Sequence, residues 1–374
     1  MNMHALFPLL AIAATLATAG RSVAAASPQG IPPTDAVERY IAIDNVCAWP
    51  NLTAMPDGSI TAAIYSRPVA PGLKHGEEEG SIEVWGSADG RFWEKRGVAA
   101  PHDPQTNRLH AAAGLAKNGD LIVLSSGFSN IQQPGRPKQA RFRDAGLPPW
   151  VCRSSDGGRT WTQLKEFATQ EKGWSRFVPF GDIVVGTDGA LHASAYSSIS
   201  SSQQKKQYAW HLRSDDDGRT WRAVSVIGPA NNETALLHLG GKKWLAAARS
   251  EVTRVIELFR SNDDGETWEG PQRVTDEHQL PGDLVRLKDG RLLLSYGDRI
   301  VGQFGVQAKL SSDEGRTWSA PIRLAGAIGR DCGYPSSLQR PDGKIVTAYY
   351  SASAENHTRY HMGVVIWTPP ASNP

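Results

Sequence analysis

The sequence is short of the features that mark several classes of protein. Among its 374 residues are only three cysteines, and no two have the Cys-x-x-Cys spacing of a structural zinc site. Lys and Arg number 40 against 38 Asp and Glu, which leaves no large basic field for a nucleic acid. After residue 19 no stretch is apolar and long enough to span a membrane. We therefore expect no metal, no cofactor, no nucleic-acid partner and no membrane span.

The long apolar run of this sequence lies at its N-terminus. Residues 5–19 are apolar, and the small residues at 23–26 follow as a signal peptidase site requires. We expect a signal peptide at residues 1–26, a single domain at residues 27–374, and a secreted or periplasmic protein. A short buried helix is the alternative for the N-terminal run.

One short motif recurs through the rest of the chain. The pattern S-x-D-x-G-x-T-W begins at Ser154, Ser214, Ser261 and Ser311, at spacings of 60, 47 and 50 residues, and a shortened copy begins at Ser87. In each copy the Asp carboxylate can accept hydrogen bonds from its own turn, and Gly supplies a positive φ. Trp covers a large apolar surface between neighbouring sheets. Such spacings are typical of propeller blades, so we assign the motifs a structural role and no catalysis.

Six turn signals each lie between two apolar runs, which is the pattern of a β-hairpin. They lie at residues 56–58, 118–119, 188–189, 240–241, 289–290 and 342–343. Six hairpins predict six blades, and helix signals are almost absent. The last blade would take its third strand from residues 360–367 and its fourth from residues 39–44, which removes an open sheet edge. The sequence thus predicts an all-β fold, a six-bladed β-propeller closed by an N-terminal strand in the last blade.

In this arrangement the hairpin turns and the repeated motifs share one face of the propeller disc. The opposite face carries the starts of the inner strands and the longer loops after the hairpins, so we expect function there. The strand starts are Cys47–Asn51, Thr106–His110, Ser175–Asp182, Asn231–Thr234, Gln279–Asp283 and Asp331–Ser336. The loops are His75–Glu79, Gln132–Arg143, Arg249–Glu251, Tyr296–Arg299 and Glu355–His357. Polar residues around one axis indicate a small polar ligand, such as a sugar or an acid.

The repeated motif resembles the Asp box of sialidase-like β-propellers, and four further positions resemble sialidase site residues. Glu233 resembles the Glu ahead of the fourth hairpin, and Tyr334, in Gly-Tyr-Pro-Ser, resembles the nucleophile. Arg249 and Arg299 resemble the second and third of three arginines that clamp the sugar carboxylate. The resemblance implies an exo-glycosidase that removes a terminal acidic sugar from a glycan. A neutral Tyr suits this substrate, because the sugar carboxylate would repel an anionic nucleophile, and the planar guanidinium suits a carboxylate.

Two positions depart from the family pattern. Where sialidases open the first blade with Arg-Ile-Pro, this chain has Ala48-Trp49-Pro50, so the first arginine is absent and an acidic sugar other than sialic acid also fits. The candidates to replace it or to contact substrate are Arg67, Arg108, Arg176, Trp49 and Asn51. The catalytic Asp expected after the first hairpin is also absent. Its loop offers His75 and Glu77–Glu79, of which His75 and Glu79 are our candidates for the general acid.

Two other functions remain open. A polysaccharide lyase would use Tyr or His as a base on a uronate-containing polysaccharide, and His110, His278 and His357 are available. A carbohydrate-binding propeller would have no catalysis. The propeller fold cannot decide among these functions, because one fold hosts many.

The three cysteines are expected at different places in the fold. Cys47 and Cys332 fall in the first and last blades, which would be neighbours, so we expect either a disulfide or two close thiols there. Cys152 is expected to be a buried core residue.

Overall fold

The described part of the protein is built from β-strands. The structure is a computed structural model, and it describes residues 37–70, 78–135, 137–139, 142–165, 178–201 and 204–371. The expected signal peptide and the candidates His75 and Arg176 lie outside these ranges. No helix occurs within them, so none is long and apolar enough to cross a membrane. The described part of the chain therefore has an all-β fold, as predicted.

All six predicted hairpins form as pairs of antiparallel strands, and each begins a four-stranded unit. The first unit holds β2 (Ala48–Ala54), β3 (Ile60–Ser66), β4 (Ser81–Ser87) and β5 (Glu94–Ala100). The second holds β6 (His110–Leu115), β7 (Leu121–Ser126), β10 (Trp150–Ser154) and β11 (Thr162–Leu164), with the short β8 (Phe128–Ser129) and β9 (Ala145–Gly146) as a separate ribbon. The third holds β12 (Val178–Val185), β13 (Leu191–Ser201), β14 (Gln204–Ser214) and β15 (Arg222–Pro229).

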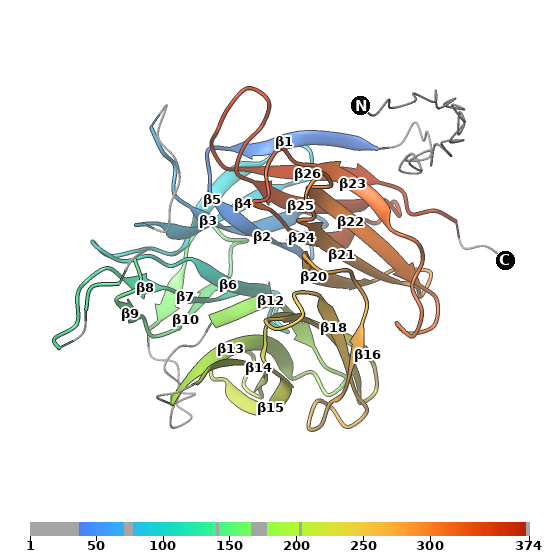
Figure 1. The fold of residues 1–374 in the computed structure, drawn as a ribbon, viewed down its shortest axis with the longest axis horizontal. Coiled ribbons are helices and arrows are strands. Elements are labelled where there is room, and N and C mark those ends of the chain that lie inside the picture. The colour runs from blue at the N-terminus through green and yellow to red at the C-terminus, as the bar shows by residue number, and fades with distance from the viewer. Residues whose placement is uncertain are drawn as a thin grey trace, which may run out of the picture. The chain divides into compact units, whose positions relative to one another are not determined.

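The remaining three units follow the same order. The fourth holds β16 (Asn231–Gly240), β17 (Lys243–Ser250), β18 (Ile256–Ser261) and β19 (Glu269–Arg273). The fifth holds β20 (Gln279–Arg286), β21 (Leu292–Asp298), β22 (Gly305–Ser311) and β23 (Ile322–Gly326). The sixth holds β24 (Cys332–Gln339), β25 (Ile345–Ser351), β26 (His361–Trp367) and, as its fourth strand, β1 (Glu38–Asp44). Because β1 pairs antiparallel with β26, both ends of the described chain share one sheet (Figure 1), as predicted.

The first strands of the six units contact one another in chain order. β2 contacts β6, β12 contacts β16, β16 contacts β20, and β20 contacts β24, which in turn contacts β2. Between the second and third units the contact is a parallel pairing of β6 with β12, which joins these units into one eight-stranded sheet. This pairing needs glycine, because a Cβ on Gly114 would lie 2.4 Å from the carbonyl oxygen of Ile183. Strand starts far apart in the sequence are thereby brought together.

The repeated motifs form the turns that the sequence predicts. In the first, Gly158 N–H donates to Ser154 Oγ (2.8 Å), Thr160 N–H donates to Asp156 Oδ1 (2.9 Å), and Thr160 Oγ1 donates to Asp156 Oδ2 (2.6 Å). The same bonds recur around Asp216, Asp263 and Asp313. Hydrogen bonds from Thr hold the pKa of Asp263 and Asp313 at about 2, below the ordinary value. These carboxylates are fully used inside their turns, in keeping with a structural role.

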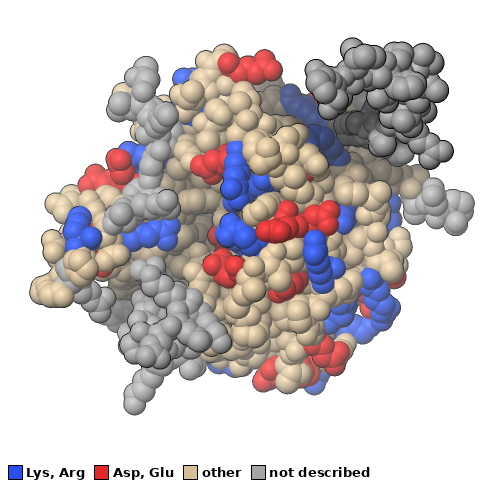
Figure 2. Space-filling view, in the orientation of Figure 1, with Lys and Arg blue, Asp and Glu red and all other residues tan. Residues whose placement is uncertain are grey.

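Apolar side chains fill the space between successive sheets. One buried cluster joins Ile122 of β7 to Leu191 of β13, and Trp161 of the first motif packs against a cluster that joins the first two units. All residues of β3, β7, β21 and β25 are buried, as expected for strands covered on both faces. On the face seen in Figure 2, basic and acidic side chains lie side by side near the middle, without a field of one sign.

Candidate active site

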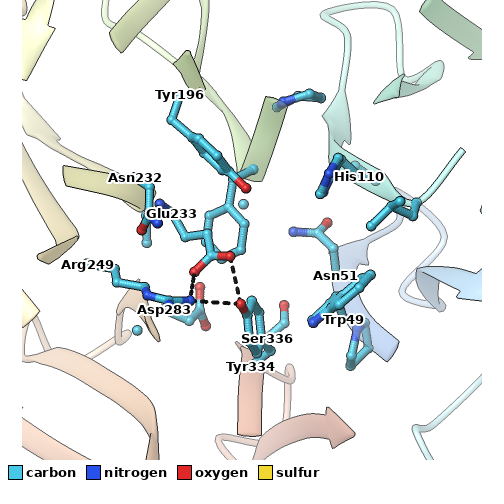
Figure 3. A pocket seen from close by; sticks show the side chains of 18 of the residues that line it. Trp49, Asn51, His110, Tyr196, Asn232, Glu233, Arg249, Asp283, Tyr334 and Ser336 are labelled. Atoms are coloured by element: carbon cyan, nitrogen blue, oxygen red, sulfur yellow. Dashed lines mark hydrogen bonds and ion pairs between the residues drawn. The ribbon is translucent and has the colours of Figure 1, made fainter. Parts of the chain in front are cut away.

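A pocket of about 570 Å³ lies where the six inner strands begin. Each of these strands contributes to its wall, through Trp49–Asn51, Leu109–Ala111, Pro179–Gly181, Asn232–Glu233, Gly282–Asp283 and Tyr334–Ser336. The wall also includes Tyr196 and Arg249 of the second strands, Arg143 and Glu251 of the loops after second strands, and Gln207 of β14. The side chains point inward from strands on all sides (Figure 3). The repeated motifs do not line this pocket, which lies among the strand starts that the sequence singled out.

Three side chains, two from the fourth unit and one from the sixth, meet in this pocket. The Tyr334 hydroxyl donates to Glu233 Oε1 at 2.6 Å, and Arg249 Nη1 donates to Glu233 Oε2 at 2.6 Å (Figure 3). Arg249 Nη1 also lies 3.1 Å from the Tyr334 oxygen. The Glu233 and Arg249 side chains are only 11% and 17% exposed, so little water weakens their attraction. Glu233 can take the phenolic proton while Arg249 stabilises negative charge on the oxygen.

The electrostatics of the group keep Tyr334 neutral at rest. Burial raises the pKa of Tyr334 well above its ordinary value, and the Glu233 carboxylate raises that pKa further. The same carboxylate raises the pKa of Arg249, which therefore stays charged. A neutral phenol bonded to a carboxylate can lose its proton as it attacks, which is how a weak nucleophile is activated by an adjacent base.

The backbone around Tyr334 is held in an uncommon conformation. Tyr334 has φ 48° and Gly333 has φ 103°, and a Cβ on Gly333 would lie 2.8 Å from the Cα of Gly297. Only glycine fits that close approach of β24 to β21. The Arg299 guanidinium lies 5.2 Å from the centre of the Tyr334 ring, and it donates to the Cys332 carbonyl (3.0 Å). These contacts fix the direction of the phenol.

The structure places Arg299 beside the nucleophile candidate rather than on the pocket wall. Its Nη2 donates to the Tyr350 hydroxyl at 3.1 Å, and Tyr350 in turn donates to Asp331 Oδ1 at 2.6 Å. Arg299 is not among the residues that line the pocket. In this structure it orders the surroundings of Tyr334 and does not reach the cavity.

Aromatic rings form the wall where the first arginine of the family was expected. Ala48 is buried, and the next residue, Trp49, has φ 62° and lines the pocket. The Trp49 ring stacks with Tyr65 at 5.9 Å between centroids and with His110 at 6.3 Å. Its centroid also lies 5.9 Å from that of Tyr334. An apolar platform thus replaces a charged group at this side of the pocket.

A polar cluster lies deeper along the inner strands. Asn51 Nδ2 donates to Asp182 Oδ1 at 2.9 Å, and the Ser337 N–H donates to Asp283 Oδ2 at 2.7 Å. Burial raises the pKa of Asp182 to about 6. Burial raises the pKa of Asp283 well above its usual range, and the charge of Asp182 raises it further. The two acids therefore do not carry two full charges at neutral pH.

Several predicted residues lie away from the pocket. Arg108 is buried with its guanidinium 3.6 Å from the centre of the Trp150 ring, and burial lowers its pKa to about 10. Glu79 Oε1 accepts from the Gln105 N–H at 2.6 Å and lines a separate surface hollow, to which Arg67 also belongs. Of the lyase candidates, His110 lines the pocket, whereas His278 and His357 do not.

The sequence reasoning missed Tyr196 and Gln207 as pocket residues, whereas Asn232 lies in the strand start Asn231–Thr234 that it named. Tyr196 lies near the end of the third hairpin, at a place similar to that of Arg249 in the fourth, and this shared placement is the signal that could have found it. Burial raises its pKa well above the ordinary value.

Within the described ranges, no group of His, Cys, Asp and Glu is arranged to hold a metal ion. Cys332 and Cys152 are buried thiols, so the disulfide alternative for Cys332 is not formed in this structure, and Cys152 is a core residue as predicted.

Comparisons with known proteins agree with this description. A family model, the BNR repeat-like domain, matches residues 75–347. The sialidase of Micromonospora viridifaciens is 25% identical over 364 residues, which cover 87% of this chain and 54% of the relative. The chain thus spans about half the length of that relative.

Solved structures resemble the fold over most of the chain. A protein of unknown function from Dyadobacter fermentans has a TM-score of 0.76 at 21% identity, over 89% of this chain and 99% of that one. A Trypanosoma rangeli sialidase, solved as a covalent intermediate with 2,3-difluorosialic acid, has a TM-score of 0.64 at 14% identity, over 88% of this chain and 58% of that one. The matched repeats and the shared fold identify this chain as a member of the BNR repeat-like family, within the sialidase superfamily.

Proposed function

We propose that this protein is an exo-glycosidase that removes a terminal acidic sugar from a glycan, with Tyr334 as nucleophile and Glu233 as its base. The contact that carries the proposal is the 2.6 Å hydrogen bond from the Tyr334 hydroxyl to Glu233, at a pocket large enough for one sugar. The relation to sialidases supports a glycosidase at the level of the family. A closed six-bladed ring, supported by the contact of β24 with β2, would shape the pocket.

The proposed reaction has two displacement steps. The Tyr334 oxygen attacks the anomeric carbon as Glu233 accepts the phenolic proton, and the bond from that carbon to the leaving oxygen breaks. The leaving oxygen takes a proton from a general acid, for which we propose His75, since Glu79 lines a separate hollow. Water then attacks the anomeric carbon and the bond from that carbon to the Tyr334 oxygen breaks. The conjugate base of the general acid takes the proton of the water, and Tyr334 recovers its own proton from Glu233. No net charge is created, because each proton taken is returned.

Arg249 is the proposed ligand of the acidic group. Its Nη1 lies 3.1 Å from the Tyr334 oxygen, so a carboxylate on or near the anomeric carbon would meet it during attack. A single arginine at this place suits a sialic acid or a uronic acid. The N-terminal run at residues 1–26 leads us to propose that the protein is secreted or periplasmic, which N-terminal sequencing of the mature protein would test.

Hydrolysis of fluorogenic glycosides tests the proposal directly. Purified protein is assayed with 4-methylumbelliferyl sialoside and glucuronide, and Tyr334→Phe is compared with the wild type. We expect the rate to fall about 1,000-fold or more, because the nucleophile is removed while the ring is kept. Tyr208→Phe, a tyrosine outside the pocket, is the matched control and should keep full activity. Unchanged hydrolysis by Tyr334→Phe would refute the mechanism.

A polysaccharide lyase is the second candidate, because His110 lines the same pocket as Tyr334 and Arg249. A base would remove the proton next to a uronate carboxylate, and the glycosidic bond would break as a carbon–carbon double bond forms. Ultraviolet absorbance of that product from a uronate polymer distinguishes this reaction from hydrolysis. Glycan binding without any turnover, unaffected by loss of Tyr334 and Glu233, would instead indicate a binding propeller.

A further inference from the structure

We propose that Asn51, Asp283 and Ser336 form a subsite for neutral sugar hydroxyls at the deep end of the pocket. The inference rests on the proposed function in taking the ligand to be a sugar. Beyond that function, we infer that the edge of the sugar that enters the pocket first carries hydroxyl groups and no second acidic group.

The three residues lie one layer below the reacting group. Asn51 follows Trp49 by two residues on β2, and Ser336 follows Tyr334 by two residues on β24. Asp283 is likewise inside β20, beyond its first residues. Because the six inner strands all begin at the pocket, these side chains lie deeper than Tyr334, and all three line the cavity (Figure 3).

Asn51 carries the clearest sign of a ligand. The side chain is only 6% exposed and its Nδ2 is committed to Asp182 Oδ1 at 2.9 Å. Its Oδ1 is buried and has no hydrogen-bond partner among the residues that the structure describes. A buried carbonyl oxygen without a donor costs free energy, so it is normally satisfied. Because Asn51 lines the pocket, a hydroxyl of a bound sugar can supply that donor.

The neighbouring groups provide both donors and acceptors. Ser336 Oγ accepts from the Leu52 N–H at 2.9 Å, which leaves its own hydrogen free to turn toward a ligand. Asp283 uses Oδ2 for the Ser337 N–H. Its second buried oxygen belongs to an acid that Asp182 and burial keep from full ionisation, so the group can accept or donate. Mixed donors and acceptors match hydroxyl groups, which do both.

The charges at this end of the pocket disfavour a second acidic group. Arg143 and Arg249 line the cavity together with the acids Glu233, Glu251 and Asp283. Arg249 is already paired with Glu233 at 2.6 Å. A ligand carboxylate at the deep end would therefore lie against Asp283, whose neighbour Asp182 adds a second acidic group behind it. The uncharged Ala48, in place of the family's first arginine, is consistent with this selection.

Aromatic side chains complete the subsite. Trp49 and Phe180 line the pocket, and their ring centroids lie 5.9 and 6.1 Å from that of Tyr334. The Trp49 Nε1 is also buried with no hydrogen-bond partner among the described residues, so it can donate to a sugar oxygen. Apolar faces with a few placed polar atoms are the usual composition of a small-ligand site.

Binding of free monosaccharides tests the inference without any need for turnover. Full-length protein is titrated by calorimetry with N-acetylneuraminic, glucuronic and galacturonic acids, and with analogues in which one hydroxyl at a time is replaced by fluorine. Fluorine cannot donate, so the analogue that lacks the hydroxyl facing Asn51 should bind about 2- to 12-fold more weakly than its parent. In Asn51→Ala that analogue and its parent should bind equally, because the acceptor is gone.

Controls separate binding from folding and from catalysis. Asn118→Ala, on an exposed hairpin turn, should keep the wild-type difference between analogue and parent. If Asn51→Ala does not fold, Ser336→Ala is measured in its place and should weaken binding of the parent. Equal effects of every fluorine substitution in wild type and variant, or no binding of any of these sugars at millimolar concentration, would overturn the subsite. Loss of hydrolysis with Asn51-dependent binding intact would refute only the proposed reaction.

Discussion

Replacing Glu233 with Gln tests the central group of the pocket by changing one charge. The Glu233 side chain accepts two hydrogen bonds of 2.6 Å, one from Tyr334 and one from Arg249, and is 11% exposed. Gln keeps the shape but presents an amide N–H₂ to one of these donors. One charge-assisted bond is lost, and the buried Arg249 loses its main counter-charge. A bond to a charged group contributes about 1.5 to 3 kcal/mol, and breaking a buried pair costs about 3 to 5 kcal/mol.

We expect Glu233→Gln to lower the free energy of unfolding by about 3 kcal/mol. Denaturant titration at neutral pH measures this change. Glu251→Gln is the control, because Glu251 lies 3.8 Å from Arg249 and is 39% exposed, and should cost at most about 1 kcal/mol. The Glu233 charge raises the pKa of Tyr334, so that pKa should fall in the variant. The pKa of Tyr334 in Glu233→Gln is measured from the absorbance of tyrosinate, after subtraction of the absorbance of the double variant Glu233→Gln/Tyr334→Phe. Equal unfolding free energies for wild type and Glu233→Gln would show that the pair is not buried as described.

Three further predictions concern the backbone and the pH dependence of the fold. Gly333→Ala should reduce glycoside turnover more than stability, because the added Cβ would displace the strand that carries Tyr334. Measuring kcat and the thermal unfolding of the same variant tests this prediction, and an unchanged kcat would contradict it. The pKa of Asp263 is lowered to about 2, so the ionised Asp263 stabilises the fold fully above its ordinary pKa of about 3.9, and this stabilisation is lost as the pH falls toward 2. In Asp263→Asn the free energy of unfolding should therefore fall less steeply between about pH 3.9 and pH 2. An unchanged slope would refute the hydrogen-bonded role of this carboxylate. Burial lowers the pKa of His211 to about 4, and its ring lies 2.8 Å from that of His192. The neutral His211 should therefore stabilise the fold fully above its ordinary pKa of about 6.5, and this stabilisation should be lost as the pH falls toward 4. In His211→Phe the free energy of unfolding, measured by urea titration, should depend less steeply on pH in this range. A steeper dependence would contradict the prediction.

Much of the fold could be predicted because its signals are local. A hairpin turn, an Asp that caps its own turn and a Gly with positive φ all act over a few residues, as at Asp156 and Gly158. Because these signals recur in several units, they are more reliable together than any one of them alone. The C-terminal part of the chain supplies only three strands of the last unit, so the pairing of β1 with β26 could also be predicted. Position along each hairpin also marked Glu233, Arg249, Tyr334, Trp49 and Asn51 as residues of one face, and all five line the pocket.

The direction of a side chain was beyond reach of the same reasoning. Arg299 and Arg108 have the spacing expected of substrate contacts, yet one guanidinium lies beside the Tyr334 ring and the other lies over Trp150. Glu79 belongs to a separate hollow, where it bonds to the Gln105 N–H. Each direction depends on which oxygen or ring another unit presents, and that is set by contacts over long stretches of chain.

The amino-acid sequence by itself determined the all-β class, the six hairpins and the face on which the polar strand starts gather, because each is written in short repeated patterns. The tertiary structure alone decided which of those residues meet. Tyr334 and Glu233 are 101 residues apart and form one 2.6 Å hydrogen bond, while Asn51 reaches Asp182 across 131 residues. These contacts between residues far apart in the sequence depend on how the six inner strands pack side by side, and no local sequence pattern predicts which of their side chains meet.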